Sequence, residues 1–143
     1  MTAFVLDASM TLAWHFEDEA SALVSAVARR ALSESVAVPL HWHLEITNAL
    51  LRGERRKRTS TSATSAFLER LQDLAMEVET VDPVRVGLVL LPLARSHRLS
   101  VYDAAYLDLA MRRGLPLATT DKSLAAAARG VGVAVIGAEG DLE

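Results

Sequence analysis

The sequence contains no cysteine and no hydrophobic stretch of the length that a membrane helix needs. The lack of cysteine among 143 residues excludes disulfide bonds, thiolate nucleophiles and cysteine-ligated metal sites. No apolar run approaches the roughly 20 residues of a membrane span, and residues 1 to 9 lack the basic start of a signal peptide. These absences predict an intracellular, cytoplasmic protein without a membrane span.

The sequence also has few aromatic residues and no excess of positive charge. Aromatic side chains make up 5% of the sequence, and the formal net charge of -3 argues against a protein that coats nucleic acid through its overall charge. A local basic patch remains compatible with that balance. Hydrophobic residues make up 51% and charged residues 23%, which excludes disorder. A chain of this length buries a core without disulfides, so we expect one domain over residues 1–143.

Short apolar runs alternate with helical patterns along the chain. Strands are expected over residues 3–7, 36–39, 76–81, from near 115, and 133–136. Helices are expected over residues 9–32, 42–57, 83–97, 102–113 and 124–128, and from the Ser/Thr-rich linker or cap at 59–65 to about 74. This alternation predicts an α/β fold with a mainly parallel central sheet flanked by helices, and ligand sites beyond the carboxyl ends of its strands.

Four acidic residues fall where the predicted elements begin or end. Asp7 closes the first strand, Asp121 follows the fourth, Asp103 begins a helix, and Glu45 lies one turn inside another helix at the border of its apolar face. Each has a simple alternative explanation. A carboxylate near a helix start caps that helix, with a gain of about 0.3 to 1 kcal/mol, and Ser100 with Asp103 fits a capping box. Glu45 alone fits a solvated helix residue.

Capping does not explain four such acids together with hydroxyl groups at Ser9, Thr119 and Thr120. Clustered carboxylates repel one another unless a cation or protons compensate their charge. Oxygen ligands without cysteine favour Mg²⁺ or Mn²⁺ over zinc. His41 and His43 form an H-x-H pair, but positions two apart on a helix face about 200° from each other, which disfavours a shared metal ion.

The ordered motifs resemble those of PIN-domain ribonucleases, and within that family those of VapC toxins from type II toxin–antitoxin modules. These motifs are "VLDAS" at 5–9, Pro39 followed by "EITNAL" at 45–50, "YDAAYLDLA" at 102–110 and "LATTDKSL" at 117–124. The likeness extends over residues 3 to 136 in the expected order. The bulky "HWH" at 41–43 departs from the pattern.

The resemblance implies a metal-dependent endoribonuclease that hydrolyses RNA phosphodiester bonds. It implies a catalytic acidic quartet of Asp7, Glu45, Asp103 and Asp121 around one or two Mg²⁺ or Mn²⁺ ions. A divalent ion lowers the pKa of water and neutralises charge that grows on the phosphate. Ser9 and Thr119 match hydroxyl positions that order the site, and Asn48 matches an asparagine one turn after the second acid. Asp108 lies about 140° around the helix from Asp103 and is left out of the metal set.

The basic run "RGERRKR" at 52–58 continues the helix that carries Glu45. It fits a solvated helix end that is favourable to the helix dipole, and it equally fits RNA binding by Arg52, Arg55 and Arg56. The resemblance further implies a VapB-like antitoxin and a homodimer. The apolar helix at 86–93 offers a surplus of hydrophobic surface for the core or an interface.

Three other functions are compatible with parts of this pattern. A Mg²⁺-dependent phosphohydrolase of the haloacid dehalogenase type normally has a second aspartate two places after the first, where this chain has Ser9. A receiver-type signalling domain normally has paired acids after its first strand. A non-catalytic RNA-binding or interaction module of the same fold would use the acids only as helix caps, and metal titration separates it from a nuclease.

Overall fold

The computed structural model describes residues 1–137 and has a central sheet of five parallel strands. The strands are β1 (Thr2–Leu6), β2 (Ser35–Pro39), β3 (Met76–Glu79), β4 (Leu117–Ala118) and β5 (Val135–Ile136). Their order in the sheet is β3-β2-β1-β4-β5, and every neighbouring pair is parallel. The predicted α/β class and parallel sheet are confirmed. The single domain expected from the sequence runs to residue 143, and residues 138–143 lie outside the described part.

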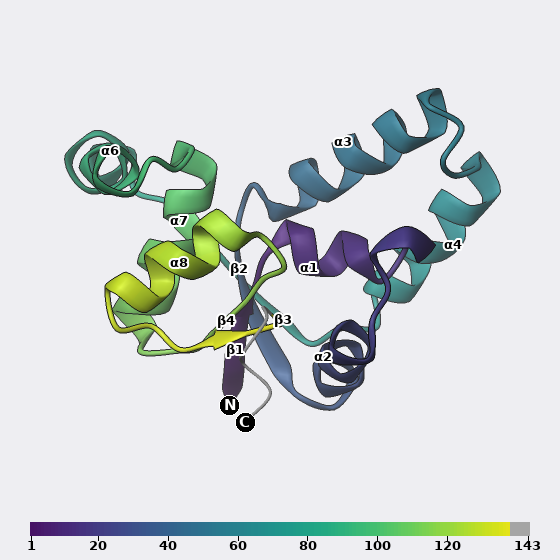
Figure 1. Cartoon of the computed structure of the whole chain (residues 1–143), viewed down its shortest axis with the longest axis horizontal. Helices are drawn as coiled ribbons and strands as arrows, with labels where there is room; N and C mark the ends of the chain where they lie inside the picture. The colour runs from purple at the N-terminus through teal and green to yellow at the C-terminus, as the bar shows by residue number, and fades with distance from the viewer. Residues whose placement is uncertain (138–143) are drawn as a thin grey trace.

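The central strand is buried on both faces, as parallel sheets require. Phe4, Val5 and Leu6 of β1 are all 0% exposed. Helix α7 (Val101–Arg113) packs against β1 and β2, and α2 (Ala22–Ser33) packs against β2. Figure 1 shows α6, α7 and α8 on one side of the sheet and α1 to α4 on the other. The continuous apolar run that predicted β1 therefore reflects a strand between two helical layers.

The single helix expected over residues 9–32 is wrong, because the chain breaks it into three pieces. They are α1 (Ala8–Ala13), the 3₁₀ turn η1 (Glu17–Glu19) and α2. Ser21 starts α2 by accepting the N–H of Val24 at 3.1 Å. An unbroken helix of that length would measure about 36 Å, more than the diameter of a small domain. The break lets α1 pack beside α3 (Trp42–Arg55) while α2 turns back onto the sheet.

The other helices lie close to their predicted ranges. They are α3, α4 (Thr61–Leu71), α5 (Pro83–Arg85), α6 (Leu91–His97), α7 and α8 (Lys122–Gly130). Most of the Ser/Thr-rich stretch belongs to α4, which Ser60 caps. Between α5 and α6 the backbone forms a π-helical segment, η2 (Val86–Leu90), just before Pro92. Proline has no N–H and its ring clashes with the carbonyl four residues earlier, so the wider π turn keeps the segment helical. Within residues 1–137, no helix combines the length and apolar character needed to span a bilayer.

The strand order reverses beside β1 and so defines the ligand edge. β2 and β3 lie on one side of β1, and β4 and β5 lie on the other. At the carboxyl ends of β1 and β4, the N–H of Asp7 donates to the carbonyl of Ala118 at 3.1 Å. Ligands of open α/β sheets bind in the crevice at such a switch point. The fold therefore brings the first and last predicted acids to the edge where a site is expected.

Candidate active site

Asp7 follows β1 directly and is 3% exposed. Its Oδ1 accepts the N–H of Met10 at 2.8 Å, and the Ser9 hydroxyl donates to both carboxylate oxygens at 2.8 and 2.9 Å. The Thr119 hydroxyl donates to Oδ2. Burial raises the pKa of Asp7 from its ordinary 3.8 to about 7, although these hydrogen bonds oppose the rise, and the charge of Asp103 adds to it. This carboxylate is therefore costly to ionise unless a cation accompanies it.

Ser9 and Thr119 join the ends of β1 and β4 into one structure. The Ser9 hydroxyl accepts the N–H of Thr120 at 3.1 Å, and the Thr119 hydroxyl accepts the N–H of Asp121 at 3.0 Å. Each hydroxyl has one proton, which it donates to Asp7. The two oxygens lie 3.2 Å apart without a proton to share while Asp7 is ionised. This network fixes the turn that carries Asp121 relative to Asp7.

Glu45 lies in the first turn of α3, where two aromatic side chains contact it. The Tyr106 hydroxyl donates to Glu45 Oε1 at 2.7 Å, and His41 Nε2 lies 3.3 Å from the same oxygen and 3.2 Å from the carbonyl oxygen of Tyr102. Burial, followed by the hydrogen bond to Glu45, raises the pKa of Tyr106, so its hydroxyl stays protonated and donates. Tyr106 is not among the site residues predicted from the sequence. Its spacing three residues after Asp103, on the same helix face, was an available signal.

Asp103 and Asp121 complete the set of predicted acids. Asp103 lies in the first turn of α7, where its N–H donates to the Ser100 hydroxyl at 3.0 Å. Burial, then the charges of Asp121 and Glu45, raise the pKa of Asp103 to about 6. Asp121 caps α8 by accepting the N–H of Leu124 at 3.0 Å. Asp103 thus interacts electrostatically with all three of the other acids.

Helix capping accounts for two of the four acids. The side chains of Asp7 and Asp121 cap α1 and α8, whereas those of Glu45 and Asp103 cap no helix. None of the four forms an ion pair with a described arginine or lysine. As placed, no three His, Asp or Glu side chains of residues 1–137 stand close enough to hold one metal ion. The structure therefore gathers mutually repelling acids at one edge, and their action as a metal-binding quartet stays a prediction.

Asp108 belongs to a different charge cluster. It is 8% exposed and lies 2.9 Å from guanidinium nitrogens of both Arg85 and Arg112. Two cations compensate its charge, so a metal ion is not needed there.

The three residues of the "HWH" sequence face different surroundings. His41 contacts Glu45, Trp42 is 2% exposed in the core, and the ring of His43 packs edge-on against Trp42 at a centroid distance of 4.8 Å. Of the three, only His41 borders the acidic site.

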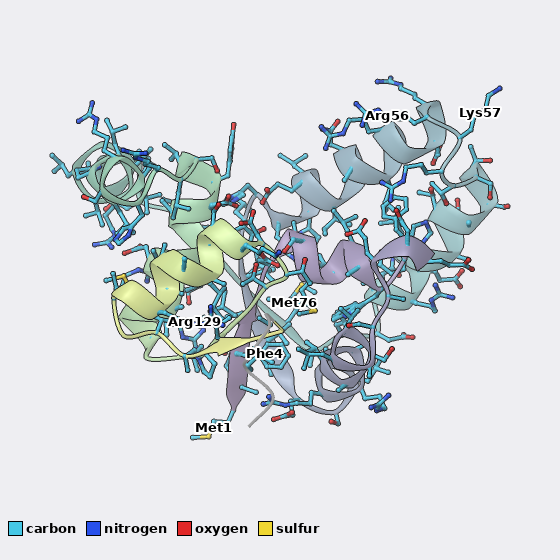
Figure 2. All side chains as sticks on the ribbon, in the orientation of Figure 1. Met1, Phe4, Arg56, Lys57, Met76 and Arg129 are labelled. Atoms are coloured by element: carbon cyan, nitrogen blue, oxygen red, sulfur yellow. The ribbon has the colours of Figure 1, made fainter. Side chains whose placement is uncertain are left out.

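The predicted supporting and RNA-binding residues of α3 lie at increasing distances from Glu45 along the helix. Asn48, Arg52, Arg55 and Arg56 are all exposed. Glu45, Asn48 and Arg52 line one surface hollow of about 440 Å³. Figure 2 shows Arg56 at the outer end of α3, with its side chain directed away from the body of the protein. The structure thus places Asn48 and Arg52 beside Glu45, and Arg55 and Arg56 farther out.

Comparison with known proteins agrees with this architecture. The sequence model of the PIN domain matches residues 4–130. "Ribonuclease VapC3" from two strains of Mycobacterium tuberculosis is 31% identical over 125 residues, which cover 86% of this chain and 85% of the relative. "Ribonuclease VapC3" from Pyrobaculum aerophilum is 33% identical over 125 residues, with 85% and 91% covered.

A solved structure shows the same fold. The crystal structure of PAE2754 from Pyrobaculum aerophilum aligns with a TM-score of 0.67 at 25% identity, covering 94% of this chain and 90% of that one. The match to the PIN-domain model over residues 4–130 includes most of β1, all of β2, β3 and β4, and all four predicted acids. The chain therefore belongs to the PIN-domain family and is similar to its VapC ribonucleases.

Proposed function

We propose that the protein is a Mg²⁺- or Mn²⁺-dependent endoribonuclease that acts as the toxin of a toxin–antitoxin pair, with residues 1–143 as one domain. One observation carries this proposal: acids from four separate elements interact at the switch point of the sheet, and helix capping explains only two of them. The relatives named as ribonucleases support the same activity.

The donor set fits a hard divalent cation. All four side chains offer carboxylate oxygens, which suit Mg²⁺ and Mn²⁺. The raised pKa values of Asp7 and Asp103 reflect burial and mutual repulsion. A bound cation would compensate the cost of ionising these acids from both causes. Asp7, Glu45, Asp103 and Asp121 would hold the ion. When bound, it would supply an acidified water and neutralise charge on the phosphate.

The chain's own groups orient these ligands. Ser9, Thr119 and the N–H of Met10 donate to Asp7 and fix its carboxylate, while Tyr106 donates to one oxygen of Glu45 and leaves its second oxygen available. The basic side chains of α3, Arg52, Arg55 and Arg56, would bind the RNA backbone. Affinity for RNA would therefore fall as the salt concentration rises.

The test is RNA cleavage by the full chain with and without divalent ions. We expect Mn²⁺ or Mg²⁺ to support cleavage and chelation to stop it. Asp7→Asn should abolish cleavage with the fold retained, because the substitution removes a ligand charge and keeps the size of the side chain. Asp73→Asn is the matched control, since Asp73 is exposed after α4 and its loss should leave the rate unchanged. Metal-dependent cleavage by Asp7→Asn would contradict the assignment.

The alternatives give different results in the same assay. A non-catalytic module of this fold would bind RNA without cutting it and would gain no stability from Mn²⁺. A phosphohydrolase would release phosphate from a monoester such as p-nitrophenyl phosphate and leave RNA intact.

We also propose that the protein is cytoplasmic, pairs with a VapB-like antitoxin and forms a homodimer. An apolar surface near α5 and α6 supports self-association, since Val84 is 63% and Leu88 is 73% exposed. A small DNA-binding protein encoded directly upstream would support the pairing. A monomeric mass in light scattering at micromolar concentration would contradict the homodimer.

A further inference from the structure

Helix α3 carries an acid of the site and a row of arginines on the same face. At 100° per residue, Asn48, Arg52, Arg55 and Arg56 all lie within about 80° of Glu45 around the helix axis. Each of the four is exposed. Glu54 is the single acid in the basic run 52–58, and it lies about 180° from Glu45. This face of α3 therefore carries an acid near its N-terminal end and only arginines among its charged residues toward its C-terminal end.

The arginines on this face are available to bind a ligand. Arg52, Arg55 and Arg56 form no ion pair with any residue of the described range, whereas Arg58, the last arginine of the run, pairs with Asp18 at 2.9 Å and Glu19 at 3.4 Å. In a protein with a net charge of -3, three unpaired guanidinium groups in one row form a local anion-binding surface. We call Arg52, Arg55 and Arg56 the α3 ridge.

The spacing of the ridge can be compared with that of a nucleic acid backbone. With a rise of about 1.5 Å per residue, Arg52 lies about 10 Å and Arg56 about 16 Å from Glu45 along the helix axis. A stacked strand carries one phosphate per about 3.4 Å, so about 16 Å corresponds to about five phosphates, and to fewer in an extended strand. The hollow lined by Glu45, Asn48 and Arg52 joins the acidic site to the start of the ridge.

We propose that single-stranded RNA leaves the acidic site along α3, with one flank of the scissile bond bound to the α3 ridge. The inference rests on the proposed nuclease function. Phosphates near the scissile bond meet Arg52, and phosphates up to about five nucleotides away meet Arg55 and Arg56. A single row of cations fits one backbone, so the ligand is an unpaired strand and the contacts are independent of base sequence.

The first experiment uses cleavage, because the acidic site then fixes the position of the RNA. Cleavage positions are mapped on an unstructured RNA with the wild-type protein and Mn²⁺. Four substrates are then made around one cleavage position. On each side of that position the flank has either about two or about eight nucleotides. We expect Arg55→Glu/Arg56→Glu to lower kcat/KM about tenfold or more on the substrate with both flanks long. On substrates in which the flank that contacts the ridge is short, the variant should have little effect on kcat/KM. Shortening the other flank should leave the effect of the variant unchanged.

The control is Arg29→Glu. Arg29 is an exposed arginine of α2, which lies on a different part of the surface from the outer half of α3 (Figure 1). This single substitution changes the net charge by two units, half the change in the double ridge variant, and should lower kcat/KM equally on all four substrates. An equal loss on long and short flanks for the ridge variant would overturn the proposed path.

The second experiment does not depend on cleavage. Binding of a labelled oligouridylate of about ten nucleotides is measured in chelator as a function of salt. The double ridge variant should flatten the plot of log K against log salt by about 1.4, which corresponds to two phosphate contacts on single-stranded RNA. Arg29→Glu should not change the slope. If the wild type cuts no RNA but the ridge variant flattens the slope, the nuclease function fails and the ridge remains an RNA-binding surface.

An unchanged salt slope in the double variant would overturn the ridge as an RNA-binding surface. If the same variant also binds polyglutamate more weakly, the ridge belongs to an acidic protein partner instead of RNA.

Discussion

At the scale of single residues, the Tyr106 hydroxyl decides how Glu45 is presented to the site. Tyr106 is 1% exposed and donates to Glu45 Oε1 at 2.7 Å. Hydrogen bonds to charged groups contribute about 1.5 to 3 kcal/mol. The bond also restricts the rotation of a half-buried side chain, which His41 Nε2 approaches at 3.3 Å. We therefore assign Tyr106 a positioning role for the second acid.

Tyr106→Phe should lower kcat/KM for RNA cleavage about ten- to a hundredfold, because the ring still fills the core while Glu45 loses its donor. The apparent affinity for Mn²⁺ should weaken in the same variant, a change that a purely structural role would not produce. Calorimetric titration of Mn²⁺ checks this. Tyr102→Phe removes a hydroxyl from a 62% exposed side chain and serves as the control. Equal behaviour of the two variants would contradict the positioning role.

At the scale of elements, α3 approaches the loop before η1 closely because it carries Gly53. A Cβ at Gly53 would lie 2.9 Å from the ring of Phe16 and 3.3 Å from Thr59. The Phe16 ring cannot move away easily, because it is 6% exposed and the Arg58 guanidinium lies 4.1 Å from its centroid. The glycine therefore sets the distance between α3 and the loop that follows α1.

Gly53→Ala should destabilise the protein by about 1 kcal/mol. The gain in helix propensity is about 1 kcal/mol, whereas overpacking costs about 1 to 3 kcal/mol. Thermal unfolding should show a Tm lower by roughly 4 °C. Gly130→Ala in α8 is the opposite case, since its Cβ would meet nothing within 4 Å. That variant should be neutral or more stable, and a gain in stability at both positions would contradict the packing explanation.

The sequence predicted most elements because their signals are local. Pro83, Gly114 and the apolar run of β1 mark their boundaries directly in the chain. It did not predict the break between α1 and α2, where the Ser21 cap lies within an alanine-rich helical pattern. The alanine-rich spacing dominated a cap that is worth about 1 kcal/mol. The π segment has no comparable signal, because it depends on how the backbone before Pro92 relieves the clash with the carbonyl four residues earlier.

The candidate site was predictable only in part for the same reason. Asp7 and Asp121 follow strands, and parallel strands share one carboxyl edge, so their proximity followed from the fold class. The Tyr106–Glu45 bond joins residues 61 positions apart and depends on how α3 and α7 pack. The spacing of Tyr106 from Asp103 indicates a shared helix face but not the partner across the fold, and a tyrosine within an apolar pattern satisfies the requirements of a core position equally well.

At the scale of the whole molecule, the buried acids link stability to pH. In the unfolded chain Asp7 loses its proton near its ordinary pKa of 3.8, whereas in the folded protein it keeps the proton up to about 7. Asp103 behaves alike, with a folded pKa of about 6. Between these values the folded state binds more protons than the unfolded state, so raising the pH favours unfolding. The metal-free protein should therefore be more stable at pH 5 than at pH 8.

Mn²⁺ should oppose this trend, because it binds the ionised acids and must displace their protons. At a concentration about 100 times its Kd, an ion that binds only the folded state adds about 2.7 kcal/mol to stability. Thermal unfolding at pH 5, 6.5 and 8 with chelator or Mn²⁺ should show the largest Mn²⁺-induced rise in Tm at pH 8. Asp7→Asn should raise the Tm of the metal-free protein at pH 8 and abolish the response to Mn²⁺, whereas Asp73→Asn should retain both wild-type behaviours. A rise in Tm with Mn²⁺ that is equal in wild type and Asp7→Asn would show that the ion binds elsewhere. That result would contradict the assignment of the metal site to the acids at the sheet edge.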